Sequence, residues 1–186
     1  LSNFAGYQPL NLSKQFLGDI TIAEALKASL NVPAVTALQT IGVNQFLSRL
    51  NLAGINMTNA DGLSVALGGG GLSLWELVKL FTLLSNDGNV LDLHFGHQNT
   101  APIKLFESNT IHQLNGILSQ YARGKNRVSP AIINADIALK TGTGPNQSDA
   151  WAIGNNGNYV VGVWVGSPSG SALPNNMGAS AALPLL

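Results

Sequence analysis

Hydrophobic residues in the middle of the chain recur at intervals of three and four, as on one face of a helix. The residues at this spacing are Leu74, Leu77, Val78, Phe81 and Leu84. Ser73 and Glu76 precede most of them as a capping box, in which each side chain satisfies a backbone amide that the helix leaves without a partner. Asn86-Asp87-Gly88 ends the pattern. The segment is therefore predicted to be a core helix.

Other helices are predicted closer to both ends of the chain, over residues 21–29, 33–41, 44–50 and 110–121. Thr21 and Glu24 form a second capping box, and Pro33 suits a first turn because its missing N–H has no helical partner there. Ser29-Leu30-Asn31 should therefore lie in a tight junction between two helices. Residues 61–71, which end in four glycines, are predicted to be a loop.

Short apolar runs predict strands over residues 137–141, 150–153 and 159–165. Asn156-Gly157 lies between the last two strands and predicts a tight hairpin turn with positive φ at both residues. Helices followed by antiparallel strands indicate an α+β fold, with the helices packed on an antiparallel sheet.

The composition suits one compact domain, since 45% of the 186 residues are hydrophobic. Nine basic residues balance nine acidic ones, which disfavours binding to nucleic acid. Cysteine is absent, so disulfides and thiolate metal sites are excluded. No stretch approaches the roughly 20 apolar residues of a membrane span. We expect a globular domain without a metal or cofactor.

The motif Lys140-Thr141-Gly142-Thr143-Gly144 stands at the end of a predicted strand and combines a cation, two hydroxyls and bare backbone. An extended peptide can pair with such a strand. A carboxylate can be bound by the side chains of Lys140, Thr141 and Thr143. The alternative is an ordinary edge strand with a solvated lysine.

Ser29-Leu30-Asn31 offers a hydroxyl for proton relay and an amide that can bind a peptide. The alternative is local capping, in which the Asn31 side chain holds the free amides of the helix at Pro33.

Together these residues resemble the motif set of the penicillin-binding proteins and related β-lactamases: Ser-x-x-Lys, Ser-x-Asn and Lys-Thr-Gly. The resemblance covers nearly all of the chain. Residues 24–35 are similar to the second-motif region of class A penicillin-binding proteins, and residues 66–74 to their glycine turn. Residues 139–143, 149–151 and 161–166 are similar to their active-site strand and hairpin, and the ending resembles the 1C type.

The resemblance implies a β-lactamase/transpeptidase-like fold and a serine D,D-transpeptidase that cross-links peptidoglycan. The implied catalytic residues are Ser29, which relays protons to the leaving group, Asn31, which orients the stem peptide, and Lys140, which supplies positive potential.

The implied substrate-binding residues are Thr141, Gly142 and Thr143. The two threonine hydroxyls would bind the terminal carboxylate of the substrate. The backbone N–H of Thr143 would be one of two oxyanion-hole donors.

The nucleophile of this family, the serine of Ser-x-x-Lys, is missing from the sequence. The residues three positions before the six lysines are Asn11, Glu24, Glu76, Ala101, Ala122 and Ile137. We expect residues 1–186 to be a partial transpeptidase domain, incomplete at both ends, with the nucleophile upstream. A homologue that has lost its nucleophile is the alternative. A partial domain exposes core surface, so we expect the isolated chain to be inactive and poorly stable.

The implied partners are D-Ala-D-Ala stem peptides and β-lactam antibiotics. The implied location is the bacterial cell envelope, on the periplasmic face of the inner membrane, with an anchor outside this chain. Two other functions stay open: a D,D-carboxypeptidase or β-lactamase on the same fold, and a non-catalytic peptide-binding homologue.

Two further signals are interpreted as structural. His94 and His97 lack a third ligand at suitable spacing, which argues against a metal site. Trp75, Trp151 and Trp164 lie in apolar elements, so core packing is expected for each of them rather than sugar stacking.

Overall fold

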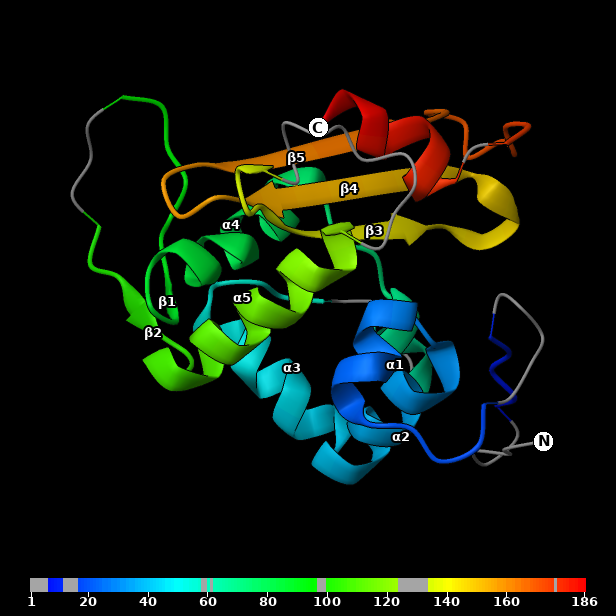
Figure 1. The fold of residues 1–186 in the computed structure, drawn as a ribbon, viewed down its shortest axis with the longest axis horizontal. Coiled ribbons are helices and arrows are strands. Elements are labelled where there is room, and N and C mark those ends of the chain that lie inside the picture. The colour runs from blue at the N-terminus through cyan, green and yellow to red at the C-terminus, as the bar shows by residue number, and fades with distance from the viewer. Residues whose placement is uncertain are drawn as a thin grey trace. The chain divides into compact units, whose positions relative to one another are not determined.

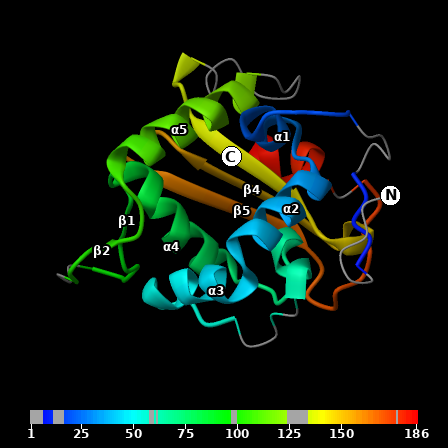
Figure 2. The ribbon, with the colours of Figure 1, turned by 90° about the horizontal axis from the view of Figure 1, so that it is seen from below.

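The computed structural model describes residues 7–11, 17–57, 60, 62–96, 100–123, 134–175 and 177–186. Two compact units make up the chain, residues 1–72 and residues 73–186. Figures 1 and 2 show the helices and strands of each unit.

The first unit is helical in its described part. Its elements are α1 (Ile22–Ala28), α2 (Asn31–Ile41), α3 (Val43–Leu52) and the short 3-10 helix η1 (Gly62–Leu67). The capping box of Thr21 and Glu24 begins α1, as predicted. The buried apolar side chains of these four elements are Ala25, Val35, Leu38, Leu50 and Val65.

Helix α2 begins at Asn31, two residues before the predicted start. Its first amides are capped by Asn11, whose Oδ1 accepts hydrogen bonds from the N–H of Asn31 at 3.0 Å and of Val32 at 3.2 Å. The alternative in which Asn31 caps this helix is wrong, because its Nδ2 donates to the carbonyl of Leu10 at 2.7 Å. A cap supplied from a distant segment leaves no local sequence signal.

The predicted loop over residues 61–71 is wrong for Gly62–Leu67, which form η1. Six residues are too few to show helical periodicity, which explains the error. Among the glycines after η1, Gly69 has the least room for a side chain. A Cβ on Gly69 would lie 2.3 Å from Ser64 Oγ, so only glycine fits there without a shift.

The second unit combines helices with a three-stranded antiparallel sheet, which confirms the predicted α+β class. Its helices are α4 (Leu74–Ser85) and α5 (Ser108–Arg123), and its sheet strands are β3 (Ala138–Thr143), β4 (Asp149–Asn155) and β5 (Val160–Gly166). Short elements complete it: the strand pair β1 (Asn89–Val90) and β2 (Ile103–Lys104), η2 (Pro145–Gln147), η3 (Gly178–Ala182) and η4 (Leu183–Leu185). The capping box of Ser73 and Glu76 begins α4, as predicted.

Different elements cover the two faces of the sheet (Figures 1 and 2). Helix α4 packs on one face, where a Cβ on Gly162 of β5 would lie 2.5 Å from Val78 Cγ2. The opposite face packs against the C-terminal turns η3 and η4. The buried cluster on that face consists of Tyr121, Leu139, Ala150, Ala152, Ala182 and Leu183.

The hairpin between β4 and β5 is longer than predicted. Asn155 pairs with Val160, so the loop contains four residues instead of the two in Asn156-Gly157. Only Gly157 has a positive φ, of 88°. Asn156 Oδ1 accepts hydrogen bonds from the N–H groups of Asn158 at 3.1 Å and Tyr159 at 2.9 Å. This side chain organises the loop, so Asn156 needs no left-handed conformation.

Core packing is the wrong prediction for two tryptophans. Trp75 is 46% exposed and Trp164 is 37% exposed. The Trp75 ring lies 5.7 Å from that of Phe95. The Trp164 indole N–H donates to Asp149 Oδ1 at 2.8 Å. Each ring has a specific partner at the surface, which hydrophobicity alone does not predict.

Candidate active site

Ser29 ends α1 in a left-handed conformation, with φ 56° and ψ 46°. Its backbone N–H donates to the carbonyl of Leu26 at 3.1 Å, and the residue is exposed to solvent. A residue other than glycine in this conformation costs about 1–2 kcal/mol, because Cβ approaches the following carbonyl. Strain of this kind is concentrated at functional sites in proteins. The predicted helix junction is thus present, and it is strained at the serine.

Asn31 lies two residues further along, in the first turn of α2, and is partly buried. Its Nδ2 donates to Leu10 and its backbone N–H donates to Asn11, so the segment at residues 10–11 holds both the side chain and the main chain. Asn11 is 5% exposed and acts as a buried anchor. The carboxamide orientation is therefore determined by residues that sequence reasoning did not single out.

Strand β3 carries the other four candidate residues at one edge of the sheet. Within the described residues, β3 pairs only with β4. The N–H of Gly144 donates to the carbonyl of Asp149 on the β4 side at 2.7 Å. Because backbone groups of successive residues alternate in direction, those of Thr141 and Thr143 point away from β4, to the outer edge. The N–H of Thr143 has the direction that an oxyanion-hole donor at this edge requires.

The Lys140 ammonium reaches the same outer edge. Its Nζ donates to the carbonyl of Thr141 at 2.7 Å and lies 4.8 Å from the centre of the Tyr121 ring. The hydroxyl of Tyr121 in turn pairs with Thr141 Oγ1. Tyr121 belongs to α5 and is only 2% exposed. Sequence reasoning missed it, because a tyrosine near a helix end carries no motif.

Thr143 Oγ1 accepts a hydrogen bond from the N–H of Gly178, the first residue of η3, at 3.1 Å. The two backbones are in close contact here. A Cβ on Gly178 would lie 2.3 Å from the carbonyl oxygen of Gly142. On the face that carries the Thr143 side chain, the backbone at Gly142 is therefore approached by the chain's own C-terminal turn. Gly178 is a second residue that the sequence did not reveal.

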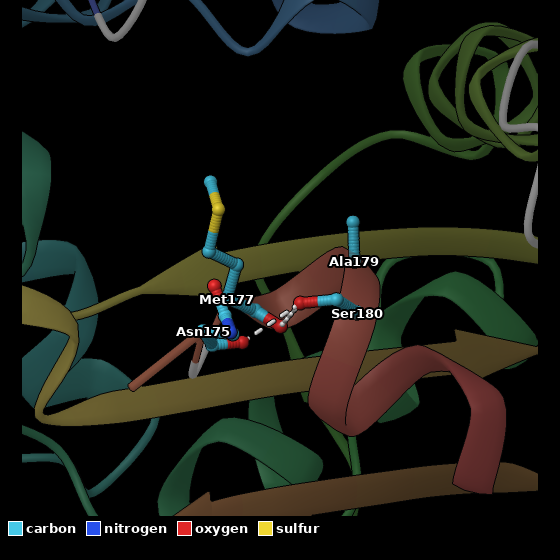
Figure 3. Close-up of a pocket in the computed structure, with 4 residues that line it drawn as sticks. All are labelled: Asn175, Met177, Ala179 and Ser180. Carbon is cyan, nitrogen blue, oxygen red and sulfur yellow. Dashed lines mark hydrogen bonds between the residues drawn. The ribbon is translucent and has the colours of Figure 1, made fainter. Parts of the chain in front are cut away.

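A hollow of about 600 Å³ lies beside this turn, and the described residues that line it are Asn175, Met177, Ala179 and Ser180. Figure 3 shows the Ser180 hydroxyl directed back at the chain, where it donates to the carbonyls of Asn175 at 3.0 Å and Met177 at 3.3 Å. These bonds tie the turn to itself just before Gly178. The turn that contacts Thr143 is therefore internally braced.

A second hollow of about 420 Å³ lies near the other end of β3, and its lining includes Asn115, Ala138 and Asn155. The asparagine side chains that line this hollow are hydrogen-bonded mainly to one another and to neighbouring elements. Asn155 Oδ1 accepts from Ser85 Oγ at 2.5 Å, and Asn155 Nδ2 donates to Asn115 Oδ1 at 3.3 Å. Asn155 is 4% exposed, so this network joins α4, α5 and β4 as a structural element.

The described residues contain no group of three His, Cys, Asp or Glu side chains that could hold a metal ion. His97 lies outside the described residues, so the predicted absence of a histidine pair site stays a prediction. In the part of the chain that the structure describes, none of the helices is both long and apolar enough to cross a membrane.

Comparison with known proteins identifies homologues of the chain. Penicillin-binding protein 1C of Escherichia coli (strain K12) is 34% identical over 188 residues, which cover 97% of this chain and 24% of that protein. The chain is homologous to the class A penicillin-binding proteins. The resemblance seen in the sequence is thereby confirmed. No protein-family model matches the chain.

Solved structures of penicillin-binding proteins share the fold of this homologue. Penicillin-binding protein 1A from Haemophilus influenzae matches 96% of this chain with a TM-score of 0.79 at 17% identity, over 35% of its own chain. Penicillin-binding protein A from M. tuberculosis, in an imipenem acyl-enzyme complex, matches 94% with a TM-score of 0.71 at 16% identity, over 49% of its own chain. The chain thus spans about a quarter of its curated relative and less than half of these two structures.

The candidate residues of this homologue of the penicillin-binding proteins lie in two different units of the chain. Ser29 and Asn31 lie in the unit of residues 1–72, and Lys140 to Thr143 lie in the unit of residues 73–186. Within the second unit, the structure brings Lys140 and Thr141 together with Tyr121, and Thr143 together with Gly178.

Proposed function

We propose that the chain supplies the substrate-binding part of a peptidoglycan D,D-transpeptidase. The observation that carries the proposal is the outer edge of β3, where the Lys140 ammonium, the outward N–H of Thr143 and two threonine hydroxyls occur within four residues. Homology to the class A penicillin-binding proteins supports the same activity. An extended peptide that ends in a carboxylate can pair with such an edge and find a cation and hydroxyls at its end.

The reaction needs a serine that this sequence does not contain. A serine of a Ser-x-x-Lys segment, outside these 186 residues of the same protein, attacks the D-Ala-D-Ala peptide bond and releases the terminal D-Ala. The acyl group then passes to an amine of a neighbouring strand. The N–H of Thr143 is one of the two donors that stabilise the oxyanion of the tetrahedral intermediate.

Ser29 and Asn31 have separate roles in this proposal. The Ser29 hydroxyl relays a proton to the leaving amine, and the Asn31 carboxamide orients the stem peptide. Lys140 keeps the local potential positive, which favours the carboxylate and the oxyanion. Thr141 and Thr143 bind the carboxylate, with the bare backbone of Gly142 between them.

The same homology supports the proposed setting. The substrate is the stem peptide of peptidoglycan, and β-lactams inhibit the enzyme by mimicking that peptide. The protein acts in the bacterial cell envelope, on the periplasmic face of the inner membrane, and is anchored by a segment outside this chain.

Labelled penicillin tests the proposal on the full-length protein. We expect a covalent adduct that survives denaturing electrophoresis, with the label mapped to the serine of an upstream Ser-x-x-Lys segment. A protein that has this segment but forms no adduct would overturn the proposal. Binding of stem peptides without any adduct would identify a non-catalytic homologue. Release of the acyl group to water in preference to amines would identify a carboxypeptidase or β-lactamase.

A structure of the penicillin adduct tests whether the two places form one site. We expect Asn31 and Thr143 to contact the same bound penicillin. Asn31 and Lys140 on opposite sides of the molecule, with no shared cleft, would contradict the assignment.

A further inference from the structure

Tyr121 contacts two neighbouring residues of β3 that point in opposite directions. Successive side chains of a strand lie on opposite faces, so Lys140 and Thr141 start from different sides of the sheet. The Tyr121 hydroxyl nevertheless pairs with Thr141 Oγ1, while the Lys140 ammonium lies 4.8 Å from the centre of its ring. Both contacts are possible because Tyr121 lies at the edge of β3, where a long lysine side chain can bend around the strand.

The ring of Tyr121 is a fixed platform. It is 2% exposed and belongs to the buried cluster formed with Leu139, Ala152 and Leu183. A lysine side chain by contrast has four rotatable bonds and loses much rotamer freedom when it is held in place. The face of an aromatic ring attracts an ammonium group through its quadrupole. A rigid ring therefore favours one position of an otherwise mobile cation.

We propose that Tyr121 is a positioning residue that holds the Lys140 ammonium at the outer edge of β3 and orients the Thr141 hydroxyl. This inference rests on the proposed function, in which that edge receives the carboxylate of the substrate. The ammonium is then placed before the substrate arrives. The bond to Tyr121 also restricts the directions left to the Thr141 hydroxyl.

The contact with Gly178 orients the hydroxyl of Thr143 in a similar way. Thr143 Oγ1 accepts the N–H of Gly178, so one lone pair is occupied and the hydroxyl hydrogen is directed elsewhere. Thr143 can therefore donate that hydrogen to a carboxylate. Tyr121 and Gly178 approach neighbouring positions of the strand from two different elements, α5 and η3.

Two substitutions separate the two contacts of Tyr121. Y121F removes the hydroxyl and keeps the ring, whereas Y121L removes the ring and keeps an apolar side chain in the buried cluster. Y159L is the matched control, because Tyr159 lies on the β4–β5 loop with 72% of its surface exposed. All variants are made in the full-length protein.

The first readout compares acylation by benzylpenicillin with acylation by its methyl ester, which lacks the carboxylate charge. A positioning role predicts that Y121L slows acylation by benzylpenicillin about tenfold, a size typical of a partly desolvated cation–π contact. Acylation by the ester should slow by a clearly smaller factor, since the ester has no carboxylate charge and only its oxyanion depends on Lys140. We expect Y121F to lie between Y121L and the wild type, and Y159L to match the wild type.

An equal loss with both compounds would show that Tyr121 supports only the fold, and would overturn the inference. Wild-type acylation rates of Y121L with both compounds would also overturn it. If the wild-type protein is acylated by neither compound, the proposed function fails, and the second readout decides the inference.

The second readout does not depend on activity. Trace acetylation of the folded protein, read by mass spectrometry, measures how accessible each lysine amine is. We expect Lys140 to react several-fold faster in Y121L than in the wild type, relative to Lys104 of the same chain as the internal reference. Equal relative reactivity of Lys140 in the two proteins would refute the placement of its ammonium by the ring.

Discussion

The Ser29-x-Asn31 corner and the outer edge of β3 are organised in different ways. In the corner, the helix end places Ser29 directly, because the serine is itself the left-handed residue that stops α1. At the edge of β3, the backbone is a regular strand, and the positions of Lys140 and Thr143 depend on Tyr121 and Gly178. Ser29 is thus placed mainly by local backbone geometry, whereas Asn31, Lys140 and Thr143 are held by contacts with distant segments.

This difference predicts whether a substitution changes the backbone, the function or both. Changes at the corner should alter the backbone and the function together, because the same residue carries both. Changes around β3 should separate them, since one set of residues forms the strand and another set positions its side chains.

The largest effect is expected from K140M, which keeps the length of the side chain and removes its charge. Penicillin acylation of the full-length protein should fall roughly ten- to hundredfold, as expected for loss of a hydrogen bond to a charged group. The free energy of unfolding should change little, because β3 remains a regular strand. The matched control is K104M, which removes another ammonium of the same unit. If K104M lowers acylation as much as K140M does, the specific role of Lys140 is lost.

G178A should destabilise the unit of residues 73–186. The added Cβ would lie 2.3 Å from the Gly142 carbonyl oxygen, so η3 must move away from β3. We expect the free energy of unfolding to fall by about 1–3 kcal/mol, the usual cost of overpacking. Urea denaturation of the full-length protein, followed by tryptophan fluorescence, measures it.

The control for this substitution is G116A, because Gly116 lies within α5 and a Cβ there meets nothing within 4 Å. It should raise the free energy of unfolding by about 0.5–1 kcal/mol, since alanine is the better helix former. Equal effects of G178A and G116A would contradict the close contact between η3 and β3.

S29G and S29A test the corner, where backbone and function should change together. Both remove the hydroxyl and should slow acylation. Glycine relieves the left-handed strain, so S29G should be about 1 kcal/mol more stable than S29A. Thermal or urea unfolding of the two variants measures the difference. Equal stability of S29G and S29A would mean that Ser29 does not hold the strained conformation in solution.

The smallest effect is expected from acidification, at the start of α4. Hydrogen bonds from the backbone and side chain of Ser73 lower the pKa of Glu76 below its ordinary value. The ionised carboxylate therefore stabilises the folded state above that ordinary value, and the contribution is lost as the pH falls through the lowered pKa. E76Q should remove this part of the acid dependence, which pH-dependent urea unfolding measures. An unchanged acid profile in E76Q would disagree with this assignment.

Much of the fold was predictable from local signals. The capping boxes at Thr21 and Ser73 and the apolar spacing of α4 act within one or two helical turns, so they are readable in the sequence. The predictions that failed concern partners far along the chain or at the surface. Asn11 caps α2 from twenty residues upstream, and Trp164 bonds to Asp149 across the β4–β5 pair, so neither has a local signal.

The candidate site shows the same division. The order and spacing of Ser29, Asn31 and the Lys140–Thr143 strand were visible in the sequence, and they led to the homology that the comparison found. Tyr121 and Gly178 were not visible, because a tyrosine in a helix and a glycine before a terminal turn occur in any protein. Their roles depend on which backbone atoms lie beside them after folding.

The residues of β3 that carry charge, hydroxyls and bare backbone can be identified from the amino-acid sequence, because those properties belong to the amino acids. The sequence also determined that successive residues alternate in direction, because every strand does so. The position of the Lys140 ammonium over the Tyr121 ring and the hydrogen bond between Thr143 and Gly178 come from the packing of distant segments. Such contacts arise when segments far apart in the chain pack into one core, and local preferences do not specify which segments meet.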